Sequence, residues 1–123
     1  MVFTNEELAA ILRLAHAMAN ADGKVTNEEA QIVAIEMIRF GVDENKARLI
    51  AEIGDNMSYS ECCQIVSRMT TEEKKYVTAY LGTIICADGN IDDAEIKLWS
   101  LISALCDLPV MSIKDAVRIM ASL

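Results

Sequence analysis

The chain has 123 residues, of which 53% are apolar, and nineteen acidic against eleven basic side chains give it a net charge of −8. This length suits a single domain with its own core, and the large apolar share excludes intrinsic disorder. The negative charge disfavours nucleic acid and anionic membrane surfaces as partners, so we expect neither.

Five glycines and one proline, among many Ala, Leu, Ile, Met and Glu residues, favour helices over strands. Apolar residues at helical spacing, with N-cap signals before them, predict seven helices. In chain order we expect them at residues 5–21, 27–40, 44–53, a short helix from Ser58 or Ser60 to Val66, then 71–88, 93–108 and 113–120.

Capping boxes, in which two side chains three residues apart bond to each other's backbone N–H, mark several helix starts. The predicted pairs include Thr4 with Glu7, Thr26 with Glu29 and Asp92 with Glu95. Glycine can take the left-handed conformation that ends a helix, and proline cannot continue one. The predicted stops are Gly23, Gly41, Gly54, Gly89 and Pro109.

One stretch, residues 21–29, occurs a second time in looser form at residues 87–95, with the shared pattern Ala-Asp-Gly-x-(Val/Ile)-(Thr/Asp)-x-x-Glu. We interpret this as an internal duplication within one domain, residues 1–123, whose halves span about 4–53 and 70–123. A three-helix unit cannot bury its apolar face alone, but two such units packed together can. The predicted fold is therefore all-α, a single bundle of about seven helices built from a duplicated three-helix unit.

The residues before the first predicted helix form no secretory signal, and the most apolar stretch, around residues 76–87, is too short to cross a bilayer. We therefore expect a cytoplasmic protein without direct membrane insertion. The cysteines show no zinc-type spacing, which favours reduced thiols packed as small apolar side chains. They are Cys62, Cys63, Cys86 and Cys106.

Two Ala-Asp-Gly-x-(Val/Ile)-x-x-x-Glu turns between helices, in a small acidic helical chain, resemble the TerB-like (tellurite-resistance protein B-like) domain family. The resemblance covers nearly the whole chain and is strongest from Asn20 to Glu29. It implies an all-helical bundle of about seven helices, a bacterial cytoplasmic setting and a non-enzymatic role. We expect the partner of such an accessory module to be another protein. Acidic residues in such turns are suspected of binding metal. Carried over to this chain, they are Asp22 and Glu29 in the first turn and Asp88 and Glu95 in the second.

The same turns also share part of the EF-hand pattern. If Gly23 is the loop glycine at position six, Glu29 falls at position twelve, but position one is Met18. In the second copy position one is Ile84. Neither residue can ligate Ca²⁺, which needs several oxygen ligands from such a loop, so the pattern argues against a true EF-hand.

Helix stops, capping boxes and the apolar residues before the caps, Val25 and Ile91, which can pack onto the following helix, account for every repeated position except Asp22 and Asp88. A carboxylate at the C-terminal end of a helix is disfavoured by up to about 1 kcal/mol. Three explanations stay open: each Asp accepts N–H groups of its own turn, pairs with a Lys or Arg, or holds a cation. In the third, Glu29 and Glu95 fold back toward their Asp, and the carboxylates with turn carbonyls and water suit Ca²⁺ or Mg²⁺.

No complete catalytic motif occurs in the sequence, and the only histidine, His16, lies on a mainly apolar helix where a boundary position is expected. We therefore expect no enzyme. The predicted function is a TerB-like, stress-related binding or scaffold module with weak divalent-cation sites at the two turns. The alternative is a metal-free helical protein–protein interaction domain whose acidic surface recognises a basic partner.

Overall fold

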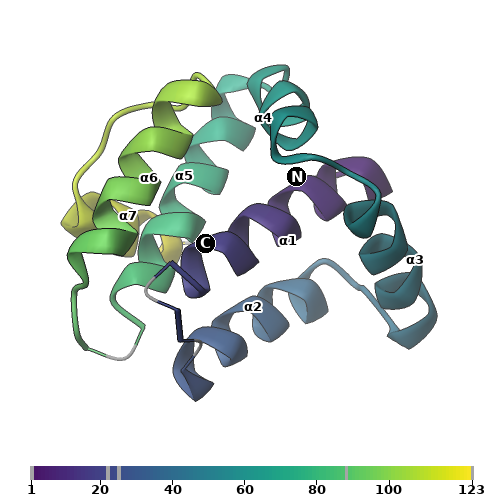
Figure 1. Ribbon diagram of the computed structural model, residues 1–123, viewed down its shortest axis with the longest axis horizontal. Coiled ribbons are helices and arrows are strands. Elements are labelled where there is room, and N and C mark those ends of the chain that lie inside the picture. Colours follow the sequence, from purple (N-terminus) through teal and green to yellow (C-terminus); the bar gives the residue numbers. More distant parts are fainter. Residues whose placement is uncertain (1, 22, 25, 88, 123) are drawn as a thin grey trace.

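The computed structural model describes residues 2–21, 23–24, 26–87 and 89–122. These residues contain seven helices and no strand, which confirms the predicted all-α bundle (Figure 1). The helices are α1 (Asn5–Ala19), α2 (Asn27–Arg39), α3 (Glu44–Asp55), α4 (Tyr59–Ser67), α5 (Thr71–Ile85), α6 (Asp93–Leu105) and α7 (Ile113–Ala121). None of the described helices is long and apolar enough to cross a membrane.

Each helix begins after a residue whose side-chain oxygen accepts a backbone N–H of the first turn, which is what an N-cap requires. In the first capping box the Thr4 N–H donates to the Glu7 carboxylate at 2.8 Å, and the Glu7 N–H donates to the Thr4 hydroxyl at 3.1 Å. Ser58, rather than Ser60, caps α4. The caps in chain order are Thr4, Thr26, Asp43, Ser58, Thr70, Asp92 and Ser112.

The helix ends depart further from the sequence prediction than the helix starts do. α1 and α5 end at Ala19 and Ile85, earlier than predicted, because their C-caps, Asn20 and Cys86, have ψ values of 10° and 13° and leave the helical path. α3 ends at Asp55, one residue beyond the predicted end near Gly54.

α6 was expected to continue almost to Pro109, but it ends at Leu105. Asp107 takes a left-handed φ of 53°, and the Leu108 N–H donates to the Ser103 carbonyl at 2.8 Å, which is a Schellman ending. Gly41 plays the same part after α2, with a φ of 72°. The local backbone, and not the proline, therefore ends α6.

α1 and α5 form the centre of the bundle and are buried around much of their circumference, as expected of a helix enclosed by others. α3 and α4 pack on α1, α7 packs on α5, and α2 and α6 each contact both central helices. Figure 1 shows α1 crossing the middle with α2 beneath it, α3 and α4 at one end and α5 to α7 at the other.

Helix lengths repeat between the halves: α1 and α5 have 15 residues each, and α2 and α6 have 13 each. α4 packs on α1 and lies between the two sets of three helices in the chain. The duplication of a three-helix unit itself stays a prediction.

Candidate functional site

The two repeated turns connect α1 to α2 and α5 to α6, and their described backbones follow similar paths. The Gly23 N–H donates to the Asn20 carbonyl at 3.0 Å, and the Gly89 N–H donates to the Cys86 carbonyl at 3.1 Å. Both glycines are left-handed, with φ values of 84° and 82°. This confirms the prediction that they occupy positions where a side chain would strain the backbone.

Two of the four predicted metal ligands, Asp22 and Asp88, lie outside the described residues. The other two, Glu29 and Glu95, lie in the first turns of α2 and α6. Both glutamates are almost completely buried, with exposed fractions of 3% and 4%. Such burial is unusual, because ionised carboxylates normally stay in water unless they are paired.

Glu29 forms the capping box that the sequence predicts. The Thr26 N–H donates to Oε1 of Glu29 at 2.9 Å, and the Thr26 hydroxyl accepts from the Glu29 N–H at 3.1 Å. One carboxylate oxygen is therefore committed to the helix start. An ionised carboxylate has about four lone-pair positions, so Glu29 keeps acceptor capacity beyond the cap.

The second turn differs, because the predicted box between Asp92 and Glu95, both described residues, does not form. Asp92 is the N-cap, but its carboxylate accepts from the Ala94 N–H at 2.8 Å, one residue short of Glu95. The N-cap ψ is 133° at Asp92 and 161° at Thr26, so the two caps differ in backbone conformation as well as in the N–H that they bind.

Burial raises the pKa of the nearby Cys86 thiol, and the Glu95 carboxylate acts in the same direction.

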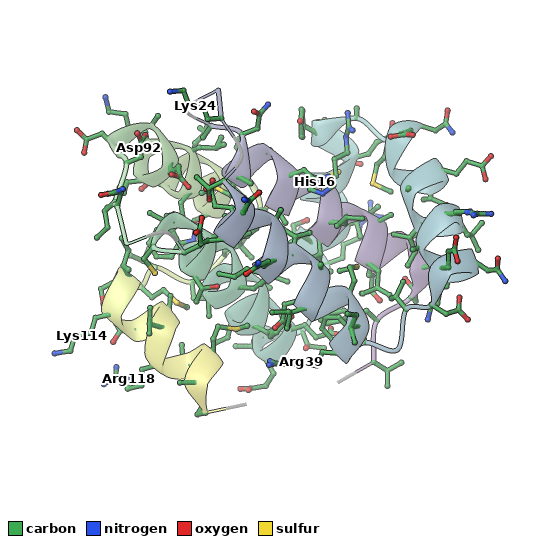
Figure 2. All side chains as sticks on the ribbon, turned by 90° about the horizontal axis from the view of Figure 1, so that it is seen from below. His16, Lys24, Arg39, Asp92, Lys114 and Arg118 are labelled. Carbon is green, nitrogen blue, oxygen red and sulfur yellow. The ribbon has the colours of Figure 1, made fainter. Side chains whose placement is uncertain are left out.

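The two turns lie at the same end of the bundle, and both views place them side by side. In Figure 1 the two connections lie next to each other at the lower left. In Figure 2, Lys24 of the first turn and Asp92 of the second lie along the same edge. Within the described ranges no group of three or more His, Cys, Asp or Glu side chains is arranged to hold a metal ion.

A third buried glutamate, Glu36 of α2, was not singled out from the sequence. The Tyr76 hydroxyl of α5 donates to Oε2 of Glu36 at 2.5 Å, and Nη1 of Arg39 lies 3.1 Å from Oε1. Burial raises the pKa of Tyr76, and the hydrogen bond to Glu36 raises it further. Glu36 follows Glu29 by two helical turns and so shares its face, a spacing that could have pointed to it.

The other side chains considered from the sequence are the four cysteines and His16. All four cysteines are free thiols, with Cys62 and Cys106 buried and Cys63 and Cys86 partly exposed. His16 is exposed on the last turn of α1.

Comparisons with known proteins agree with this fold. The family described as Tellurite resistance protein TerB matches residues 6–119, nearly the whole chain. A crystal structure of a protein of unknown function from Porphyromonas gingivalis W83 is similar, with a TM-score of 0.85 and 41% sequence identity over 100% of this chain and 99% of that chain. None of the curated proteins matches. The resemblance predicted from the two turns is thus confirmed, and the chain belongs to the TerB family.

Proposed function

We propose that this protein is a non-enzymatic, stress-related binding or scaffold module whose two turns bind divalent cations weakly. The ligands in this proposal are Asp22 and Glu29 in the first turn and Asp88 and Glu95 in the second. The family description supports a stress-related role, and the structural relative, whose function is unknown, adds no activity. The observation that carries the proposal is the burial of Glu29 and Glu95 at neighbouring turns.

Comparison with the other capping glutamates sharpens this observation. Glu7 and Glu73 form capping boxes at the starts of α1 and α5, and both stay partly exposed. A capping role alone therefore does not require burial. Hydrogen bonds or a positive charge must offset the lost hydration of a buried carboxylate, and a bound cation is one source of such charge.

The ligand chemistry favours a hard cation. Carboxylates, turn carbonyls and water are the oxygen ligands that Ca²⁺ and Mg²⁺ prefer, whereas thiolates suit softer metals. With two carboxylates per turn, the affinity is expected to be modest.

Thermal unfolding with and without Ca²⁺ or Mg²⁺ tests the proposal. A cation that binds only the folded chain at ten times its Kd stabilises it by about 1.4 kcal/mol, which raises the melting temperature by several degrees. The double variant Asp22→Asn with Asp88→Asn should lose this gain, and Glu29→Gln with Glu95→Gln should lose it as well. Glu28→Gln with Asp93→Asn is the matched control, because both residues are exposed first-turn neighbours.

The proposal fails if millimolar Ca²⁺ and Mg²⁺ leave the melting temperature unchanged while the two Asn substitutions lower it. The aspartates then serve the turns themselves, as Asx-turn acceptors or in ion pairs. That outcome favours the alternative function, a metal-free interaction domain whose acidic surface recognises a basic protein partner.

A further inference from the structure

A cleft of about 800 Å³ lies between α1, α3, α4 and α6, and Asn20 at the start of the first turn also lines it. Its volume falls in the range typical of small-molecule sites, about 300–1,000 Å³. Ile50 and Ile102 are buried in its lining, while Leu101 and Leu105 on α6 are 54% and 62% exposed. Figure 2 shows His16, another lining residue, on α1 between α6 and the pair α3 and α4.

Arg13 of α1 supplies positive charge in this apolar lining. Its Cζ atom lies 4.7 Å from the centroid of the Tyr59 ring, a cation–π contact that positions the guanidinium. Its Nε is buried and has no hydrogen-bond partner in the described part of the chain. Asp55 also lines the cleft, but the ion pairs found among the described residues do not include Arg13.

A guanidinium stays charged in proteins, and its donors match a carboxylate with two parallel hydrogen bonds. The contact with Tyr59 uses the π-face of the ring and so leaves these donors for a ligand. The net charge of −8 opposes anions at long range, but salt screens charges beyond roughly 8 Å at physiological ionic strength. Arg13 is therefore the cleft-lining group to which we assign an anionic head group.

We propose that this cleft binds a small amphiphilic carboxylate, with its carboxylate on Arg13 and its apolar chain against Leu101 and Leu105. A slim chain can bring a terminal carboxylate to the Arg13 guanidinium at the cleft surface. A docked helix is about 10 Å wide, and its backbone would hold an acidic side chain farther from that group. Binding also removes the two exposed leucines from water, which is favourable.

Dodecanoate and dodecanol, used below their aggregation limits, are the probes, and isothermal calorimetry measures their binding to the full chain. Wild-type protein should bind dodecanoate saturably and more tightly than dodecanol. Arg13→Met should weaken dodecanoate about tenfold or more by losing the charged partner, and leave dodecanol unchanged. Arg48→Met is the matched control, because Arg48 is an exposed α3 residue paired with Glu44 and its loss changes the net charge equally.

Leu101→Asp is a second, independent variant, and folding should tolerate it because Leu101 is more than half exposed. It should weaken both probes, whereas Ile38→Asp, on an exposed position of α2 that does not line the cleft, should weaken neither. The proposal is overturned if wild-type protein binds no dodecanoate, or if Arg13→Met binds it as well as wild type. It is also overturned if an acidic, leucine-rich helical peptide binds the cleft and dodecanoate does not.

Discussion

The Tyr76 hydroxyl donates a hydrogen bond to the Glu36 carboxylate in the interior of the bundle and so joins α5 to α2. Tyr76→Phe leaves the carboxylate with only Arg39 as its partner among the contacts described above. A lost hydrogen bond to a buried charge costs about 1.5–3 kcal/mol of unfolding free energy, measurable by urea denaturation.

The double variant Tyr76→Phe with Glu36→Leu provides the control for this pair. Replacing both polar partners by apolar groups is often nearly neutral, so the double variant should be more stable than Tyr76→Phe alone. Simple additivity of the two single substitutions in a double-mutant cycle would contradict the coupling.

Replacing Gly82 and replacing Gly54 by alanine should change the unfolding free energy in opposite directions. A Cβ at Gly82 would lie 2.7 Å from Cζ2 of Trp99 and 2.8 Å from Cβ of Ala116, so α6 and α7 would have to move away from α5. We expect Gly82→Ala to lower the unfolding free energy by about 1–3 kcal/mol. A Cβ at Gly54 meets no atom closer than 3.7 Å, so Gly54→Ala should gain up to about 1 kcal/mol from helix propensity. Equal effects in chemical denaturation would refute the packing explanation.

Asp107 is the non-glycine residue with a positive φ in the described part of the chain. Because glycine takes this conformation without steric cost, Asp107→Gly should raise the unfolding free energy by about 0.5–1 kcal/mol. The ion pair that it loses, to Lys74 at 3.2 Å, is mostly exposed on the Asp107 side and contributes little. Asp107→Val should instead be destabilising, and a neutral result for Val would show that the left-handed ending is not needed.

Stability should fall at alkaline pH because burial raises the pKa of the Cys62 thiol from 9.0 to about 11. Below pH 9 both the folded and the unfolded chain keep this proton, so Cys62 does not make the unfolding free energy depend on pH there. Between pH 9 and pH 11 the unfolded chain releases the proton while the folded chain holds it, so the unfolding free energy decreases by about 2–3 kcal/mol. Urea denaturation at pH 8, 9, 10 and 11 under reducing conditions measures this slope.

Cys62→Ala should make that slope shallower, whatever it does to stability at pH 8. Cys63→Ala should make the slope shallower by a smaller amount, because Cys63 raises the pKa values of both Cys62 and Cys106 but burial of Cys62 is the larger cause. Some decline persists in both variants, because burial also raises the pKa values of Tyr76, Tyr80 and Cys106. Identical slopes in wild type and Cys62→Ala would exclude Cys62 as a source of the pH dependence.

The sequence alone determined the number of helices, where they start, and the family. These features depend on neighbours within one or two turns: Thr26 and Glu29 form their capping box because they lie three residues apart, whatever packs around them. The left-handed Gly23 and Gly89 follow from the same short-range logic. Helix ends were less predictable, because Asp107 took a conformation that the sequence suggested only for glycine.

Only the tertiary structure decided which side chains meet across helices. Glu36 and Tyr76 are 40 residues apart, and Trp99 reaches the Thr78 carbonyl, 21 residues away, beside a glycine with no space for a Cβ. The burial of Glu29 and Glu95 and the place of Arg13 in the cleft also arise from packing between helices. Periodicity fixes the face of a helix on which a residue lies. The residue that packs against that face depends on how helices distant in sequence cross. The local sequence pattern does not encode that crossing.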